Sequence, residues 1–280
     1  MDRTKASWRL KLDRAEKHLE EIDDEILLYG ESHPYRAVRD PKQNRNPNLW
    51  RYRLWIDQPP DPRIAVIFGD VIHNIRSALD HLAVGISDRE HKYRAGFPIQ
   101  LENIWAKEGR HYVLGGRAGR NKRRSFNSKI AGMTPQAIAI IKGLQPYHDG
   151  SRPALINPLY QISFLENADK HRQLLPIAPG VRHATAHVVA RGRVINQTLW
   201  GFCQNGAVVA EFGEDFTPPL QDGEVDVNLY GVPAVAIKVA RADWHVDPTQ
   251  FRTIVQWLRS DILPALEVTR HPKARHDNAP

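Results

Sequence analysis

The chain has 280 residues and a formal net charge of +7 at pH 7, with 41% hydrophobic and 25% charged residues, as in soluble globular proteins. No apolar run reaches the roughly 18 residues of a membrane-spanning helix, and the N-terminal M-D-R-T-K-A-S-W lacks an apolar signal region. The single Cys203 excludes an intramolecular disulfide. We therefore expect a cytoplasmic protein without a membrane span, whose positive charge permits binding of polyanions without requiring it.

The first elements in chain order are a helix, a loop and a strand. Apolar residues recur at alternating spacings of four and three between residues 5 and 28, which predicts an amphipathic helix ended by Gly30. Residues 31–48, rich in Pro and Asn, read as a loop. In L-W-R-Y-R-L-W-I, Trp50, Tyr52, Leu54 and Ile56 alternate with Arg51, Arg53 and Trp55. This pattern predicts a strand with one packed aromatic face, and a base-stacking platform is the alternative.

The central predicted helix covers residues 62–86, with Asp61 as N-cap and Pro62 at the first helical position. Its apolar face is broad, and the opposite arc of about 160° lacks Lys and Glu. That arc carries Asp70, His73, Asn74, Arg76, Ser77, Asp80 and His81. These residues are mostly indifferent or poor helix formers, so something other than helix stability accounts for them. Two interpretations stay open: a structural polar network, or a functional site.

The most basic part of the chain lies between residues 107 and 129, with Gly115, Gly116 and Gly119 among its cations. It predicts a mobile basic loop, either a flap that contacts phosphate groups or a solvated loop without function. The candidate nucleic-acid-binding residues are Arg117, Arg120, Lys122, Arg123 and Arg124. The glycines do not have the spacing of a P-loop.

Two further helices are predicted at 134–143, opened by Thr134 and Pro135, and at 158–174, opened by Asn157 and Pro158. The second contains N-A-D-K-H-R, in which Asn167 and His171 stand one turn apart and Asp169 lies on a neighbouring strip. Because this cluster resembles the polar arc of the central helix in type, we expect the two helices to be neighbours that share one polar network.

From residue 181 the sequence changes to short β-branched segments separated by turn residues, which predicts a small antiparallel sheet of about five strands. A last helix is predicted at 248–266. The predicted fold is therefore α+β. An N-terminal helical bundle at 1–176 contains the central helix 62–86 and the basic loop 107–129. A unit at 177–268 comprises the sheet and the C-terminal helix, and 269–280 is a basic disordered tail.

Three segments resemble a widespread family of uncharacterised bacterial proteins: G-D-V-I-H-N-I-R-S-A-L-D-H-L at 69–82, K-I-A-G-M-T-P-Q-A-I-A-I-I-K-G-L-Q-P-Y at 129–147, and N-A-D-K-H-R at 167–172. In addition, Arg76-Ser-Ala-Leu-Asp-His81 is similar to the R-x4-H motif of HEPN helical domains. Many of these domains are metal-independent RNases of toxins and antiphage systems. The resemblance implies a HEPN-like bundle that acts as a homodimer, in which Arg76 holds the scissile phosphate and His81 is the general acid/base.

Three functions follow as hypotheses. The first is an endoribonuclease or RNA-binding protein with Arg76 and His81 as catalytic residues, needing no cofactor and supported by His73, Asn74, Ser77, Asp80, Asn167, Asp169 and His171. The second is a metal-dependent hydrolase with ligands drawn from His73, Asp80, His81, Asp169 and His171. The third is a non-enzymatic binding module in which the polar arc is structural.

Overall fold

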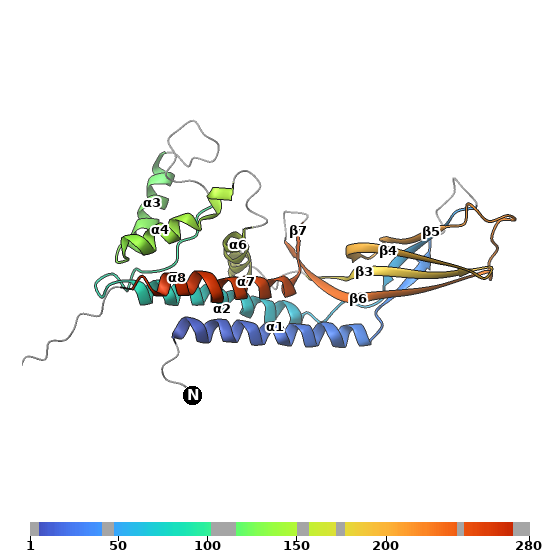
Figure 1. Ribbon diagram of the computed structural model, residues 1–280, viewed down its shortest axis with the longest axis horizontal. Coiled ribbons are helices and arrows are strands. Elements are labelled where there is room, and N and C mark those ends of the chain that lie inside the picture. Colours follow the sequence, from blue (N-terminus) through green and yellow to red (C-terminus); the bar gives the residue numbers. More distant parts are fainter. Residues whose placement is uncertain are drawn as a thin grey trace, which may run out of the picture. The chain divides into compact units, whose positions relative to one another are not determined.

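The computed structural model describes residues 6–40, 48–101, 116–149, 157–171, 177–239 and 244–270, and combines helices with antiparallel sheets (Figure 1). The chain divides into two compact units. The helical unit comprises residues 1–19, 69–173 and 250–280, and the sheet unit comprises residues 20–68 and 174–249. Both units are built from segments distant in the sequence. This division differs from the predicted one at residue 176, because the C-terminal helix joins the helical unit and residues 20–68 join the sheet unit.

Two of the points at which the chain passes from one unit to the other lie inside long helices, after residue 19 in α1 (Ser7–Glu31) and after residue 68 in α2 (Arg63–Ile86). The helical unit also contains α3 (Gly116–Ile130), α4 (Pro135–Gly143), the short η1 (Pro146–Asp149) and α6 (Pro158–His171). A C-terminal helical segment runs through η2 (Pro248–Gln250), α7 (Phe251–Trp257), the π-helical turn η3 (Leu258–Ile262) and α8 (Leu263–Glu267). The helices predicted at 5–28, 62–86 and 134–143 are confirmed, and the one at 158–174 is confirmed as far as His171.

Local capping explains where these helices begin. Asp61 accepts a hydrogen bond from the Arg63 N–H at 2.8 Å, and Thr134 accepts one from the Ala137 N–H at 3.2 Å. The Asn157 side chain accepts from the N–H groups of Leu159 and Tyr160. Each cap satisfies a backbone donor that has no partner inside the helix. The predicted starts are thus confirmed by the contacts that define them.

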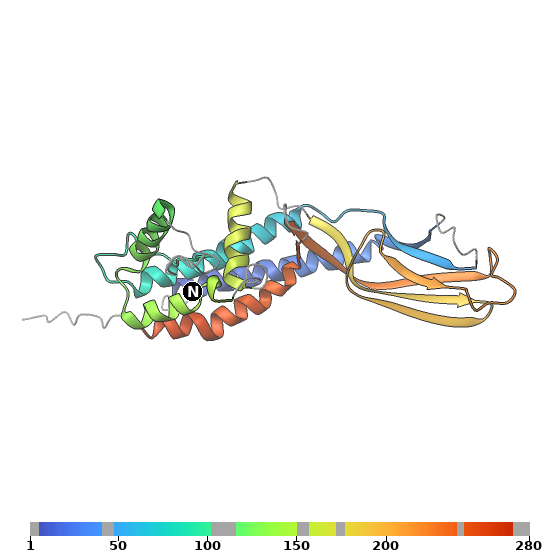
Figure 2. The ribbon, with the colours of Figure 1, turned by 90° about the horizontal axis from the view of Figure 1, so that it is seen from above.

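The C-terminal helical segment lies alongside the helical-unit parts of α1 and α2 (Figures 1 and 2). Its apolar stripe, which includes Phe251, Val255, Leu258 and Leu263, is fully buried. Arg259 joins it to α1 through Asp13 at 2.9 Å and Glu16 at 2.8 Å. An amphipathic helix must bury its stripe, and here it does so among other helices, which is why the predicted pairing of this helix with the sheet is wrong.

The predicted basic loop is a helix from Gly116 onward, and its earlier part, residues 107–115, lies outside the described ranges. Phe126 and Ile130 are buried on one side of α3, so the segment has an apolar face despite its charge. Arg and Lys are also good helix formers, which offsets the cost of Gly119. The loop prediction was wrong because it gave more weight to the glycines than to the buried Phe126 and Ile130.

The sheet unit contains two antiparallel sheets instead of the predicted one. The first orders β1 (Tyr35–Arg39), β2 (Trp50–Ile56) and β5 (Val208–Phe212). The second orders β4 (Arg193–Gln204), β3 (Ile177–Ala190), β6 (Val225–Val239) and β7 (Trp244–Val246). Buried side chains of both sheets, including Trp50, Phe212, Ala186 and Val188, form a common core. The first sheet was not predicted because β1, which pairs with β2, lies in the segment that was expected to be a loop.

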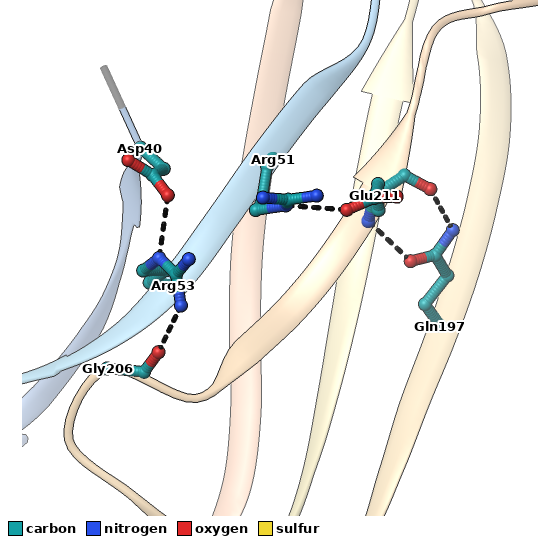
Figure 3. A network of polar contacts seen from close by, with 6 residues as sticks. All are labelled: Asp40, Arg51, Arg53, Gln197, Gly206 and Glu211. Atoms are coloured by element: carbon teal, nitrogen blue, oxygen red, sulfur yellow. Dashed lines mark hydrogen bonds and ion pairs between the residues drawn. The ribbon is translucent and has the colours of Figure 1, made fainter. Parts of the chain in front are cut away.

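The predicted strand at 50–56 is confirmed, with Trp50 and Leu54 buried. Its arginines bind within the sheet unit: Arg51 binds Glu211 at 2.5 Å, while Arg53 binds Asp40 at 2.7 Å and the Gly206 carbonyl at 2.8 Å (Figure 3). Gln197 bonds both backbone groups of Glu211. The alternation of aromatic residues and arginines therefore reflects strand packing and ion pairing. It does not form a base-stacking platform in which both arginines are available to a ligand.

Candidate functional site: a polar network on α2 and an arginine pocket beside α3

The polar arc of α2 holds an irregular segment of the chain. Arg76 donates from Nη2 to Oδ1 of Asp80 at 2.9 Å and to the Phe97 carbonyl at 2.7 Å, and Asp80 accepts from the Phe97 N–H at 2.8 Å. Phe97 is fully buried and lies in a segment without helix or strand. Buried backbone groups need hydrogen-bond partners, and here the two side chains supply both. Arg76 and Asp80 thus supply the two hydrogen bonds that a neighbouring strand would make in a sheet.

The same network reaches α6 and α3. Nε of Arg76 lies 3.7 Å from Oε2 of Glu166, and the two side chains are only 13% and 12% exposed. Burial lowers the pKa of Lys129, and the charge of Arg76 lowers it further, while Asp80 and Glu166 raise it. Two cations and two carboxylates therefore lie within interaction distance of one another. A guanidinium held in this way is not available to bind a phosphate unless these contacts break.

The predicted neighbourhood of α2 and α6 is confirmed by an ion pair of Glu166, a residue that was not among the expected ones. Asp169 lies against α2 at Gly69, where an added Cβ would come within 2.8 Å of its Oδ1. Asn167 is exposed. The side chain of His171 lies outside the description. No described side chain of α6 makes a hydrogen bond or ion pair with His81.

The remaining predicted site residues on α2 do not come together as one site. His81 is exposed and makes no hydrogen bond or ion pair with any described residue, whereas Arg76 is largely buried. Asn74 is buried and donates to the Asp70 carbonyl within α2 at 2.8 Å. His73 and Ser77 are 3.5 Å apart, too long for a strong bond. Within one chain, Arg76 and His81 do not form a shared site.

Those predicted metal ligands whose side chains the structure describes do not gather either. Across the described ranges, no three His, Cys, Asp or Glu side chains are placed so that they could hold a metal ion. Asp80, one of the candidates, is occupied by Arg76 and the Phe97 N–H. Cys203 is buried, which raises its pKa and makes it a poor nucleophile.

A pocket of about 590 Å³ lies between α3 and the turns that follow α2, wholly within the helical unit. One face of α3 supplies Arg120, Arg123, Arg124, Asn127 and Ser128, and the turns supply His91 and Arg94. The α3 residues recur at helical spacings of three and four, so they project from one side. Three predicted nucleic-acid-binding residues thus lie together, while Lys122 is not part of the lining. The side chain of Arg117 lies outside the description.

The four arginines of this pocket have different surroundings from the arginines that form ion pairs elsewhere in the chain. In the part of the chain that the structure describes, none of Arg94, Arg120, Arg123 and Arg124 forms an ion pair with a carboxylate. This contrasts with Arg51, Arg53, Arg76 and Arg259, each of which has an acidic partner. Like charges held close together repel, and an anionic ligand would remove that repulsion. We call this feature the arginine pocket.

His91 is paired with Asp88 at the wall of the arginine pocket. Nδ1 of His91 lies 2.8 Å and 3.0 Å from the two carboxylate oxygens of Asp88, and this hydrogen bond lowers the pKa of the Asp88 carboxyl group. The His91 N–H also donates to Oδ1 at 2.9 Å. Nearby, the Tyr93 ring is 76% exposed, with the Arg94 guanidinium 4.9 Å from its centroid.

Asp88, His91 and Arg94 were not among the site residues predicted from the sequence. A signal was present, since S-D-R-E-H-K-Y-R places an acid and a His three residues apart, followed by an aromatic residue and an Arg. Their meeting with α3 depends on contacts between residues about 30 positions apart, for which the sequence offers no periodic signal.

Comparisons of the chain with protein-family models, with curated proteins and with solved structures gave no match. Among the described helices, none is both long and apolar enough to cross a membrane. The resemblances noted in the sequence stay predictions.

Proposed function

We propose that this protein binds single-stranded RNA, with the arginine pocket as its contact to the phosphate backbone. The observation that carries the proposal is a group of four arginines that have no acidic partner among the described residues, around one pocket of about 590 Å³. A volume of this size is within the range of ligand-binding pockets, which is about 300–1,000 Å³. The net charge of +7 adds a general attraction for a polyanion.

Arginine suits this role better than lysine because its planar guanidinium donates two parallel hydrogen bonds to phosphate oxygens and stays charged at all physiological pH values. On one face of α3, Arg120, Arg123 and Arg124 are spaced at one turn or less. Successive phosphates of an extended strand can therefore be held by successive side chains, with Asn127 and Ser128 as additional hydrogen-bonding groups.

Tyr93 and Arg94 favour single-stranded RNA over a duplex as the ligand. An exposed ring beside a guanidinium offers a stacking surface to an unpaired base, and such stacking contributes about 1–3 kcal/mol per base. Bases in a duplex are already stacked and do not present their faces. RNA is the nucleic acid that the resemblance of the R-x4-H segment implies.

The arrangement of α2 does not support catalysis by Arg76 and His81, because Arg76 is held by Asp80, Glu166 and the Phe97 carbonyl. The polar arc instead matches the structural interpretation. A homodimer, a role in toxin or antiphage systems and a cytoplasmic location remain predictions.

Fluorescence anisotropy with a labelled 20-nucleotide single-stranded RNA tests the proposal. The variant Arg120→Ala/Arg124→Ala removes two exposed cations of the pocket, and Arg14→Ala/Lys17→Ala removes two exposed cations of α1 as a matched control. We expect the pocket variant to weaken binding about 10–30-fold at about 0.1 M salt. It should also lower the slope of log K against log salt by about 1.4, which is roughly 0.7 for each lost phosphate contact.

The control variant should change affinity much less, because its cations are not grouped around a pocket. Equal losses in both variants would show that binding is due to net charge and would reject the arginine pocket as the site. Absence of RNA binding by the parent protein would reject the function. Competition by single-stranded DNA of the same sequence at equal strength would assign the pocket to phosphate in general instead of RNA.

A further inference from the structure

We propose that His91, positioned by Asp88, is a general base that cleaves RNA held in the arginine pocket without a metal ion. The inference rests on the proposed RNA binding and extends it from recognition to chemistry. It names a different histidine from the one in the R-x4-H segment. The observations that support it are the contact of Asp88 with His91, the space around that pair, and the arginines beside it.

The Asp88 carboxylate determines which nitrogen of His91 carries the proton. A carboxylate only accepts hydrogen bonds, so Nδ1 at 2.8 Å must be the donor. In the neutral imidazole the lone pair then lies on Nε2, which has no partner among the described residues. The ring is 40% exposed and lines the pocket. His91 is therefore prepared to accept a proton through Nε2.

The pair is held by backbone contacts on both sides. Oδ1 of Asp88 also accepts from the His91 N–H at 2.9 Å, and the Asp88 N–H donates to the Gly132 carbonyl at 2.7 Å. A Cβ at position 132 would lie 2.5 Å from the Cβ of His91 and 3.0 Å from Cγ of Asp88. Position 132 must therefore be a glycine for the pair to occupy this place, and both partners are packed against a backbone that begins at the end of α3.

The chemistry is transesterification by the RNA's own 2′-hydroxyl. Nε2 of His91 takes the 2′-hydroxyl proton while the 2′-oxygen forms a bond to phosphorus. The bond from phosphorus to the 5′-oxygen breaks, and the 5′-oxygen takes a proton from water. The products are a 2′,3′-cyclic phosphate and a 5′-hydroxyl, and His91 returns its proton to solvent. Guanidinium groups of the pocket stabilise the extra negative charge of the phosphorane-like transition state.

The experiment uses the full chain with a labelled single-stranded RNA in the presence of a chelator, and measures binding by anisotropy and cleavage by gel. We expect cleavage that leaves a 2′,3′-cyclic phosphate, and no cleavage of an RNA with 2′-deoxynucleotides throughout. His91→Ala should lower the cleavage rate about 10²–10⁴-fold, the usual contribution of a general base, while changing RNA affinity less than about threefold. Free imidazole should restore part of the activity of His91→Ala, which a purely structural role would not allow.

Asp88 is a positioning residue in this scheme. Asp88→Asn keeps the shape of the side chain but loses its charge, so the cleavage rate should fall with little change in RNA affinity. His91→Gln serves as a second variant, because it keeps a polar side chain without acid–base function. Thermal melting of all three variants checks that each is folded.

RNA that is bound but not cleaved by the parent protein would overturn this inference and leave the proposed RNA binding intact. Parental cleavage rates in His91→Ala prepared in the same way would also overturn it, and would trace the activity to a contaminant or another residue. Cleavage lost in His81→Ala and kept in His91→Ala would assign the chemistry to the R-x4-H segment instead. Absence of RNA binding would reject the proposed function itself.

Discussion

Arg76 and Asp80 stand one turn apart on α2, with Nη2 and Oδ1 2.9 Å from each other, and together they hold both backbone groups of Phe97. Salt bridges of this spacing on a solvated helix contribute only about 0.3–0.5 kcal/mol. Here the pair also satisfies a buried N–H and a buried carbonyl that have no strand partner. Its contribution to stability is therefore larger than its ion pair alone would imply.

The first prediction concerns this network. Arg76→Ala should lower the free energy of unfolding by about 2–4 kcal/mol, because it leaves the buried Phe97 carbonyl without this donor and removes the ion pair with Glu166. Urea denaturation measures the change. His81→Ala, on the exposed side of the same helix, should change it by less than about 0.5 kcal/mol. A fully stable Arg76→Ala protein would contradict the structural role of Arg76.

The second prediction compares two glycines. Gly132→Ala should destabilise the protein by about 1–3 kcal/mol, because its Cβ would meet the Cβ of His91, which is too close to the backbone to move away. Gly69→Ala meets only the carboxylate end of Asp169, which can rotate, and alanine favours a helix by about 1 kcal/mol over glycine. Gly69→Ala should therefore be neutral or stabilising in the same thermal melts. If Gly69→Ala destabilised the protein more than Gly132→Ala, an added Cβ at position 132 would not meet the steric clash with His91 that we infer.

The third prediction is a pH dependence in the sheet unit. Arg191 donates from Nε and Nη2 to the two carboxylate oxygens of Glu224 at 2.8 Å and 2.7 Å, and these bonds lower the pKa of Glu224 below its ordinary 4.5. A carboxyl group with a lowered pKa in the folded state stabilises that state above its unfolded pKa, and the stabilisation is lost as the pH falls toward the folded value.

Glu224→Gln should therefore lower the urea midpoint of the sheet unit at pH 7, and the difference from the parent should shrink once the pH falls below about 4.5. Arg193→Ala, whose partner Asp215 lies in a separate exposed pair, serves as a comparison for general loss of charge. A difference between parent and Glu224→Gln that is constant from pH 7 to pH 3 would show that the Arg191 bonds do not act through the ionised carboxylate.

Much of the local structure could be predicted from the sequence. The helices that begin after Asp61, Thr134 and Asn157 were placed within one or two residues, because a cap and an apolar stripe act between residues less than about five positions apart. The strand at 50–56 was predicted for the same reason. The error at α3 was also local, since two apolar anchors, Phe126 and Ile130, outweighed the glycines.

The sequence by itself therefore determined where most helices begin, which faces are apolar, and that α2 and α6 carry unusual polar residues. Only the tertiary structure decided what those residues contact. It brought Arg76 to the backbone of Phe97, placed the C-terminal helix among the other helices, and grouped His91 and Arg94 with the arginines of α3. The reason is physical: side-chain periodicity and capping are properties of neighbouring residues, whereas the partner of a buried charge depends on how distant segments pack to satisfy every buried polar group.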